Sequence, residues 1–248
     1  MLASAADIEA IERATLAAVS PAAVGEMPGW LLPYDSGTVG RAKSAVPLRH
    51  DAPTPLAVPD IERHYAARRL PAIFRVPETP AFQAMRDELA TAGYRPGKPT
   101  QVCIAPLAPL QGEAQPRVLL SPTPDAHWAS VFLGEGFDPV DGASRVKLLS
   151  RAPQALFASI REQGATIAGG MMSFSDGWAS VHGMRTALAW RRRGLAERVL
   201  LAMAAQALAK GYQRVFLQVE AANTAALSVY VRLGFREAWT YRYWQQPS

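Results

Sequence analysis

Hydrophobic residues recur along the chain with two different periods, and these predict a succession of helices and strands. Near the start, Ile8, Ile11, Leu16 and Val19 fall on one face of a helix expected over residues 7–19. Further on, apolar residues at the four-residue spacing of a buried stripe predict a long helix over residues 195–210. Runs in which apolar and polar residues alternate lie between such segments and are typical of strands.

The first half of the chain is predicted to mix both kinds of element. Strands are expected over residues 29–34 and 38–48 around a turn at Asp35-Ser36-Gly37, and a Pro-rich stretch follows over residues 50–59. Next we expect a helix over 60–69, a strand over 72–76, a helix over 82–91 that ends before Gly93, and a strand over 101–105. Residues 107–116, with their prolines and Gly112, are the best candidate for a linker.

The second half has a clearer pattern. It predicts a strand over 117–121, helices near 125–132 and 143–150, strands over 155–162, 165–174 and 178–186, the helix over 195–210, a strand over 214–220, a helix over 224–232 and a strand over 238–244. Gly164 and Ser175-Asp176-Gly177 mark hairpin turns. This alternation predicts an α+β protein built in layers.

An internal similarity links the two halves. In each, a strand is followed by a helix, a Gly-aromatic pair and another strand, with Gly93-Tyr94 in the first half and Gly234-Phe235 in the second. If these pairs correspond, the two halves are related copies with the same strand order. An unrelated α+β cap over residues 1–110 is the alternative.

Composition and charge narrow the class of protein. The formal net charge of +5 is small and dispersed, which argues against nucleic-acid binding. Cys103 is the only cysteine, so an internal disulfide and a zinc site made of cysteines are excluded, and we expect no metal. The sequence has no apolar run long enough to cross a membrane. Residues 1–9 lack the features of a signal peptide, so a cytoplasmic location is expected.

The most informative stretch is Arg191-Arg192-Arg193-Gly194-Leu195-Ala196, which lies between a predicted strand and a predicted helix. The first turn of a helix has unpaired N–H groups and a partial positive charge, so it favours anions. A glycine allows a phosphate to approach the backbone closely. This stretch therefore predicts a phosphate or pyrophosphate site. No Lys-Ser/Thr pair follows Gly194, so it is not a P-loop.

A second motif follows, with Asn223, Ala226, Tyr230 and Leu233-Gly234-Phe235. Together with Arg191-x-x-Gly194-x-Ala196, it resembles the GNAT superfamily of acetyl-CoA-dependent N-acetyltransferases, over about residues 117–244. The resemblance implies a GNAT fold with a central mixed, mostly antiparallel sheet, a splayed strand pair and flanking helices, in two lobes. It implies a catalytic domain over 115–248 and a degenerate GNAT-like or cap lobe without a cofactor motif over 1–110.

The resemblance also implies where acetyl-CoA binds. The bulged strand would bind the pantetheine arm, the loop amides would bind the pyrophosphate, and Asn223 would bond the arm or fix the local backbone. The implied cofactor residues are Met184, Arg185, Thr186, Arg191, Arg192, Arg193, Gly194, Leu195, Ala196, Glu197, Asn223 and Tyr230. Asn223 can equally be an N-cap, and Tyr230 can be an ordinary half-buried helix residue.

The expected reaction is direct attack of a primary amine on the thioester in a ternary complex. Tyr230 is the candidate acid for the leaving thiolate. The base is less clear, because Gln218 occupies the position of a glutamate that some GNAT enzymes use and Ser180 occupies that of another. Glu220 and His182 remain candidate bases, and a water chain without a dedicated base is an alternative.

Two matters stay open at this point. A non-catalytic acyl-CoA-binding or regulatory module would keep Arg191 to Ala196 but need no acid. The amine acceptor and the acyl-chain length leave no general code in the sequence, and neither does a choice between monomer and homodimer.

Overall fold

The computed structural model describes residues 3–51, 58–110 and 117–247. The predicted linker at 107–116 and the Pro-rich stretch at 50–59 lie partly outside these residues. The elements are α1 (Ala5–Val19), β1 (Ala23–Met27), β2 (Trp30–Tyr34), β3 (Val46–Pro47), α2 (Val58–Ala66), β4 (Ile73–Pro77), α3 (Gln83–Thr91), β5 (Arg95–Pro96), β6 (Thr100–Pro106), β7 (Val118–Ser121), α4 (Ala126–Ser130), α5 (Pro139–Leu149), β8 (Ala155–Glu162), β9 (Ala165–Ser175), β10 (Trp178–Thr186), α6 (Leu195–Ala209), β11 (Arg214–Glu220), α7 (Thr224–Arg232) and β12 (Arg236–Gln245). Short 3-10 helices include η1 (Gly40–Ala42) and η4 (Leu188–Trp190).

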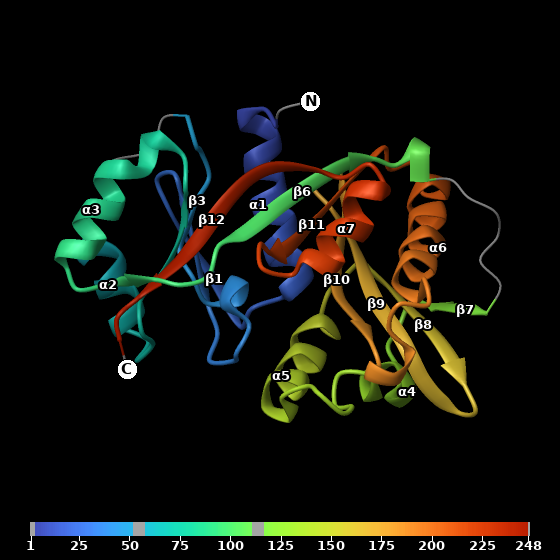
Figure 1. Cartoon of the computed structure of the whole chain (residues 1–248). Helices are drawn as coiled ribbons and strands as arrows, with labels where there is room; N and C mark the ends of the chain where they lie inside the picture. The colour runs from blue at the N-terminus through green and yellow to red at the C-terminus, as the bar shows by residue number, and fades with distance from the viewer. Residues whose placement is uncertain (1–2, 52–57, 111–116, 248) are drawn as a thin grey trace.

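A nine-stranded sheet runs through the molecule, with helices on both faces (Figure 1). Its order is β4-β12-β6-β11-β10-β9-β8-β7, and β5 pairs with β12 beside this path. Among the described residues the β10–β11 pair is parallel and the other pairs of this sheet are antiparallel. The predicted α+β class and the mixed, mostly antiparallel sheet are therefore confirmed.

A smaller three-stranded sheet has the order β1-β2-β3. A parallel bridge between Ala45 and Phe74 joins the end of this sheet to β4. A parallel pairing also occurs in the middle of the large sheet, where β10 meets β11.

Strands from the two halves of the chain alternate in the middle of the large sheet. β6 lies between β11 and β12, and β12 lies between β4 and β6. Arg95 and Arg236 each follow the Gly-aromatic pair of their own half. Arg236 pairs with Ile104 of β6, and Arg95 pairs with Gln245 of β12, so each half pairs with the other in the same way. Thr100 and Tyr241 pair with each other between these two points. The residues assigned to the two lobes therefore share one hydrogen-bonded sheet.

The helices α3 and α7 end in the same way. Gly93 and Gly234 have φ values of 87° and 84°. The N–H of Tyr94 donates to the carbonyl of Leu89 at 2.9 Å, and the N–H of Phe235 donates to the carbonyl of Tyr230 at 3.0 Å. The Gly-aromatic pair is thus the same structural device in both halves.

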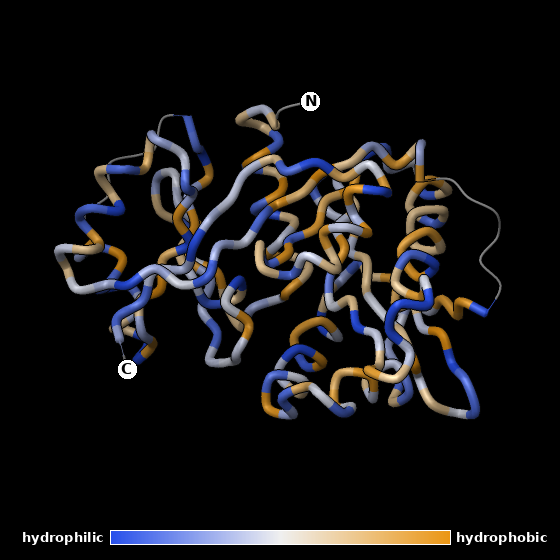
Figure 2. The backbone as a smooth tube through the Cα atoms, in the orientation of Figure 1, coloured by the Kyte–Doolittle hydropathy of each residue, from blue (hydrophilic) through white to orange (hydrophobic). Residues whose placement is uncertain are grey.

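Alternation along the strands assigns the helices to the two faces of the sheet. Leu217 packs under α6 with Val199 and Met203, whereas the neighbouring Phe216 packs under α1 with Ile11. In Figure 2 hydrophobic stretches follow α6, whereas β12 is mostly pale, and hydrophilic stretches lie in loops such as the β8–β9 turn. Burial of these apolar faces holds the helices in place.

The prediction of a strand over 38–48 is wrong. This segment contains η1 and only the two-residue strand β3, because residues Gly40–Ala42 turn away from the sheet. The strand β1 was not predicted, since its residues are mostly exposed or half-buried and carry little hydrophobic signal. The predicted strands and helices of the second half are all present, and the strands over 155–162, 178–186 and 214–220 have the predicted bounds.

Candidate active site

A bulge in β10 separates this strand from β11. β10 pairs with β11 only from Ala179 to Val181, and its register with β9 shifts between His182 and Arg185. Gly183 lies in the bulge with φ 61°, and a Cβ there would come within 2.7 Å of a methyl group of Leu149. The predicted splayed strand pair is therefore present. Among the described residues, the ladder with β11 ends before Met184 to Thr186, which leaves this edge of the backbone open to a ligand.

The loop before α6 leads into a helix end without a side-chain cap. Gly194 is the N-cap with φ 71°, in the left-handed region that favours glycine, and Arg192 has φ 61°. Among the described residues, no side chain makes a capping hydrogen bond at this N-cap. The N–H groups of Leu195, Ala196 and Glu197 have no carbonyl acceptor within the helix, so they can bind an anion.

The helix α7 supplies two of the predicted residues. Asn223 is its N-cap and accepts a hydrogen bond from the N–H of Ala226 at 3.2 Å, as an N-cap interpretation predicts. Tyr230 is 9% exposed, and burial together with nearby Cys103 raises the pKa of its hydroxyl to about 12. This tyrosine therefore stays protonated at neutral pH and can donate its proton.

These three segments enclose a cavity of about 660 Å³, which we call the loop cavity. All the predicted cofactor residues except Arg193 line it. Arg193 instead lies over the ring of Trp190, with its guanidinium carbon 4.6 Å from the ring centre. Ala226 of the second motif also lines it, and residues that the sequence did not single out complete the wall: Phe137, Trp190, Ala225, Val229 and Arg232. An uncapped helix end, an open strand edge and a buried tyrosine in one cavity fit the cofactor that the sequence predicts.

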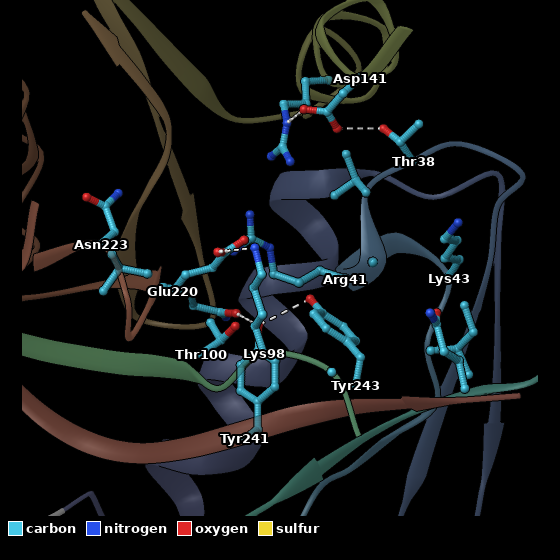
Figure 3. A pocket seen from close by; sticks show the side chains of 18 of the residues that line it. Thr38, Arg41, Lys43, Lys98, Thr100, Asp141, Glu220, Asn223, Tyr241 and Tyr243 are labelled. Carbon is cyan, nitrogen blue, oxygen red and sulfur yellow. Dashed lines mark hydrogen bonds and ion pairs between the residues drawn. The ribbon is translucent and has the colours of Figure 1, made fainter. Parts of the chain in front are cut away.

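A second cavity of about 700 Å³ adjoins the first, and we call it the central cavity (Figure 3). Arg185 and Asn223 line both cavities. Its wall comes from both halves of the chain: Thr38, Val39, Gly40, Arg41, Lys43, Ile73, Gly97, Lys98, Thr100, Asp141, Arg145, Arg185, Gln218, Val219, Glu220, Asn223, Tyr241, Tyr243 and Gln245. Sequence reasoning missed most of these residues because they come from distant segments and form no local motif.

The structure separates the two candidate bases. Glu220 lines the central cavity and lies 3.9 Å from the ammonium of Lys98, with both side chains exposed (Figure 3). His182 lines neither cavity; it is buried on the α1 side of β10 beside Phe216, with the ring centres 6.2 Å apart. Burial and the charge of Arg41 hold the pKa of His182 well below its usual value. Its position thus gives it no access to an acceptor.

Gln218 is fixed by its neighbours. Its amide donates to the Thr15 hydroxyl at 2.9 Å, and its carbonyl accepts from the Tyr241 hydroxyl at 2.8 Å. It therefore lines the floor of the central cavity as a bonded amide, and it cannot accept a proton as a carboxylate would.

Comparisons with known proteins agree with this geometry. Residues 5–244 match the model of a family described as "Probable histone acetyltransferase Rv0428c C-terminal". The chain belongs to this family and thus to the GNAT N-acetyltransferases, which are acyltransferases.

Individual relatives are similar over nearly the whole chain. An uncharacterized N-acetyltransferase, YobR of Bacillus subtilis (strain 168), is 28% identical over 237 residues, which cover 92% of this chain and 94% of the relative. A GCN5-related N-acetyltransferase from Kribbella flavida has a similar structure, with a TM-score of 0.69, 19% identity and coverage of 97% and 96%. A tandem GNAT protein from the clavulanic acid biosynthesis pathway has a TM-score of 0.55 and 16% identity, with coverage of 98% and 89%.

Among residues 3–51, 58–110 and 117–247, none of the helices combines the length and apolar character that a membrane span requires.

Proposed function

We propose that the protein transfers an acetyl group from acetyl-CoA to a primary amine by direct attack in a ternary complex. The observation that carries this proposal is the junction of the two cavities at Arg185 and Asn223. One cavity has the features that a pyrophosphate and a pantetheine arm require, and the other gives an acceptor access to the same point.

The residues of the loop cavity bind and orient acetyl-CoA in this proposal. The first-turn N–H groups of α6 and the nearby arginines hold the pyrophosphate, because both favour negative charge. The open edge of β10 from Met184 to Thr186 binds the pantetheine amides as an added strand would. Acetyl-CoA, when bound, supplies a thioester carbon that an amine can attack.

Proton transfer is assigned to two side chains. As the nitrogen–carbon bond forms and the carbon–sulfur bond breaks, the electron pair goes to sulfur, and Tyr230 donates its proton there. The proton of the attacking amine goes to Glu220, directly or through water, because Glu220 is the candidate base that lines the central cavity. Tyr230 then regains a proton from solvent.

Two measurements test the proposal. Acetyl-CoA at saturating concentration should raise the melting temperature, because a ligand that binds only the native state stabilises it. Free thiol should then appear when amines are added. Absence of stabilisation would contradict the proposal, and stabilisation without thiol release from any amine would favour a non-catalytic acyl-CoA-binding module.

The first half of the chain has a supporting role in this proposal. We infer that it is a degenerate GNAT copy that completes the sheet and forms one wall of the central cavity. The alternation of β4, β12, β6 and β11 supports a common origin. Each half contributes the strand before the helix that ends at the Gly-aromatic pair, β4 or β11, and a strand after that pair, β6 or β12. Thr38, Arg41 and Lys43 of this half line the central cavity, so the copy also takes part in choosing the acceptor.

A further inference from the structure

The central cavity carries more positive than negative charge. Its cationic side chains are Arg41, Lys43, Lys98, Arg145 and Arg185, and its carboxylates are Asp141 and Glu220. Such an excess inside a cavity is costly unless an anion offsets it, because like charges repel more strongly there than in bulk water.

Both carboxylates already have partners. Asp141 accepts hydrogen bonds from Arg145 at 2.6 Å and from the Thr38 hydroxyl at 2.8 Å, and it lies 3.7 Å from Arg185. Burial opposes these contacts, yet the hydrogen bonds from Arg145 and Thr38 keep the pKa of Asp141 below its ordinary value. Glu220 lies near Lys98. The negative charge of the wall is thus committed to three of the cations.

Arg41 and Lys43 are the cations that this pairing leaves over. Neither forms an ion pair within the described part of the chain, and the Nε of Arg41 is buried without a hydrogen-bond partner there. The charge of Arg41 acts on the buried carboxylate of Glu12, which is itself paired with Arg75 at 2.5 Å. In Figure 3 the side chain of Arg41 reaches into the cavity from η1.

The position of these two cations relative to the cofactor gives the acceptor a direction. Figure 3 shows Asn223, which borders the loop cavity, on one side of the central cavity and Lys43 on the opposite side. A molecule that spans the central cavity can therefore present one end to the thioester and the other end to Arg41 and Lys43.

The geometry points to an acceptor that is a primary amine with an anionic group, a carboxylate or a phosphate, bound by Arg41 and Lys43 at the end remote from the amine. This inference rests on the proposed function and specifies its substrate class. A guanidinium binds either anion through paired hydrogen bonds, and a lysine adds a point charge.

The excess charge also affects the amine itself. A positive surrounding lowers the pKa of a bound ammonium and so favours the neutral, nucleophilic form. The anion provides the attraction that the ammonium lacks. A Lys- and Arg-rich protein tail has no such anion, and the cavity repels it.

The test compares amines in matched pairs on protein saturated with acetyl-CoA. Amino acids are compared with their carboxamides and phosphoethanolamine with ethanolamine, and a lysine-rich peptide is included. Thiol release gives kcat and KM, and calorimetric titration on protein saturated with CoA gives Kd. We expect the anionic member of at least one pair to be preferred by about tenfold or more, as one charge-assisted contact provides.

Variants assign the preference to its residues. Arg41→Gln should raise KM and Kd for the anionic amine about tenfold while kcat changes less than about twofold. Lys43→Gln should act in the same direction. Arg236→Gln is the control, because Arg236 is an exposed arginine of β12 that lines neither cavity.

Each outcome has a distinct meaning. Equal or better reaction of the neutral amines or the lysine-rich peptide would overturn the inference while leaving the acetyltransferase proposal intact. An unchanged preference in Arg41→Gln with a normal melting temperature would do the same, as would absence of calorimetric binding by every anionic amine. Failure of acetyl-CoA to bind would instead contradict the proposed function. Calorimetry would still show whether an anionic amine binds and whether its binding depends on Arg41.

Discussion

The starts of α6 and α2 show how two similar halves differ in chemistry. At α6, the N-cap is Gly194, and no side chain among the described residues makes a capping hydrogen bond there. At α2, the N–H of Val58 donates to the carboxylate of Glu88 at 3.3 Å, and the next residue is Pro59, which has no N–H. One helix start is open to a foreign anion, and the other is bonded to a carboxylate of the protein itself.

The following helices differ in the same sense. Tyr230 of α7 lines the loop cavity, whereas Leu89, which precedes the matching Gly-aromatic pair in α3, is completely buried in the core with Phe74 and Tyr94. Phe82, which stands where Asn223 does, is also completely buried. The turn that ends the helix is present in both halves, but Tyr230 lines a cavity where Leu89 is packed in the core.

The largest effect is expected from giving α7 the residue that α3 has. Val229, just before Tyr230, corresponds to Glu88, just before Leu89, and Val229 lines the loop cavity. Val229→Glu should weaken acetyl-CoA binding by about 100-fold or more, because a carboxylate near the start of α6 competes with the pyrophosphate. Calorimetry measures this loss. Val231→Glu, at a residue 67% exposed, is the control, and equal affinity of the two variants would refute the comparison.

A second prediction uses a buried histidine from each half. Burial and Arg75 lower the pKa of His50 to about 4, and burial and Arg41 lower that of His182. The unfolded chain then binds more protons than the native protein between about pH 6.5 and pH 4, so stability falls as the pH falls through this window. The loss from His50 alone should reach about 2 kcal/mol at pH 5.

Chemical denaturation at pH 7 and pH 5 measures this loss. His50→Gln and His182→Gln should each reduce the difference in unfolding free energy between the two pH values, whatever their effect at pH 7. If the pH dependence persists unchanged in both variants, the titrating groups lie elsewhere.

The third prediction concerns Tyr230 and its apolar counterpart. Tyr230→Phe should lower kcat at least about tenfold with little change in the affinity for acetyl-CoA, because it removes the proton donor but keeps the ring. Leu89→Met should leave kcat within about twofold. Thiol-release kinetics with a reactive amine decide this, and unchanged turnover of Tyr230→Phe would reject this residue as the acid.

The smallest effect separates stability from binding. Gly194→Ala and Gly93→Ala each place a side chain at a positive φ with no atom within 4 Å of the new Cβ, so each should cost about 1 kcal/mol, or about 2–4 °C in melting temperature. Only Gly194→Ala should also weaken acetyl-CoA binding. Thermal melts with and without acetyl-CoA test this, and equal ligand-induced shifts would contradict it.

The sequence predicted local features better than those that depend on distant contacts. The strands and helices around Arg191 to Ala196 were predicted because their hydrophobic periods are regular, and the proposed cofactor residues lie within continuous motifs. The central cavity was not predicted, because Arg41, Asp141 and Gln218 meet only through the pairing of β6 with β11 and the packing of η1 near α5. His182 has the pattern of an accessible strand residue, and only the position of α1 shows that it is buried.

The exchange of strands in the middle of the sheet has a consequence for synthesis of the protein. When β6 leaves the ribosome, its final neighbours β11 and β12 do not yet exist, and β4 also waits for β12. Three strands, β4, β5 and β6, therefore keep an edge of backbone hydrogen-bonding groups open until β12, the last of the described strands, has been translated, and such edges favour pairing with other chains. A ribosome that pauses between β11 and β12 would thus hold an aggregation-prone nascent chain, in which neither half can close its sheet.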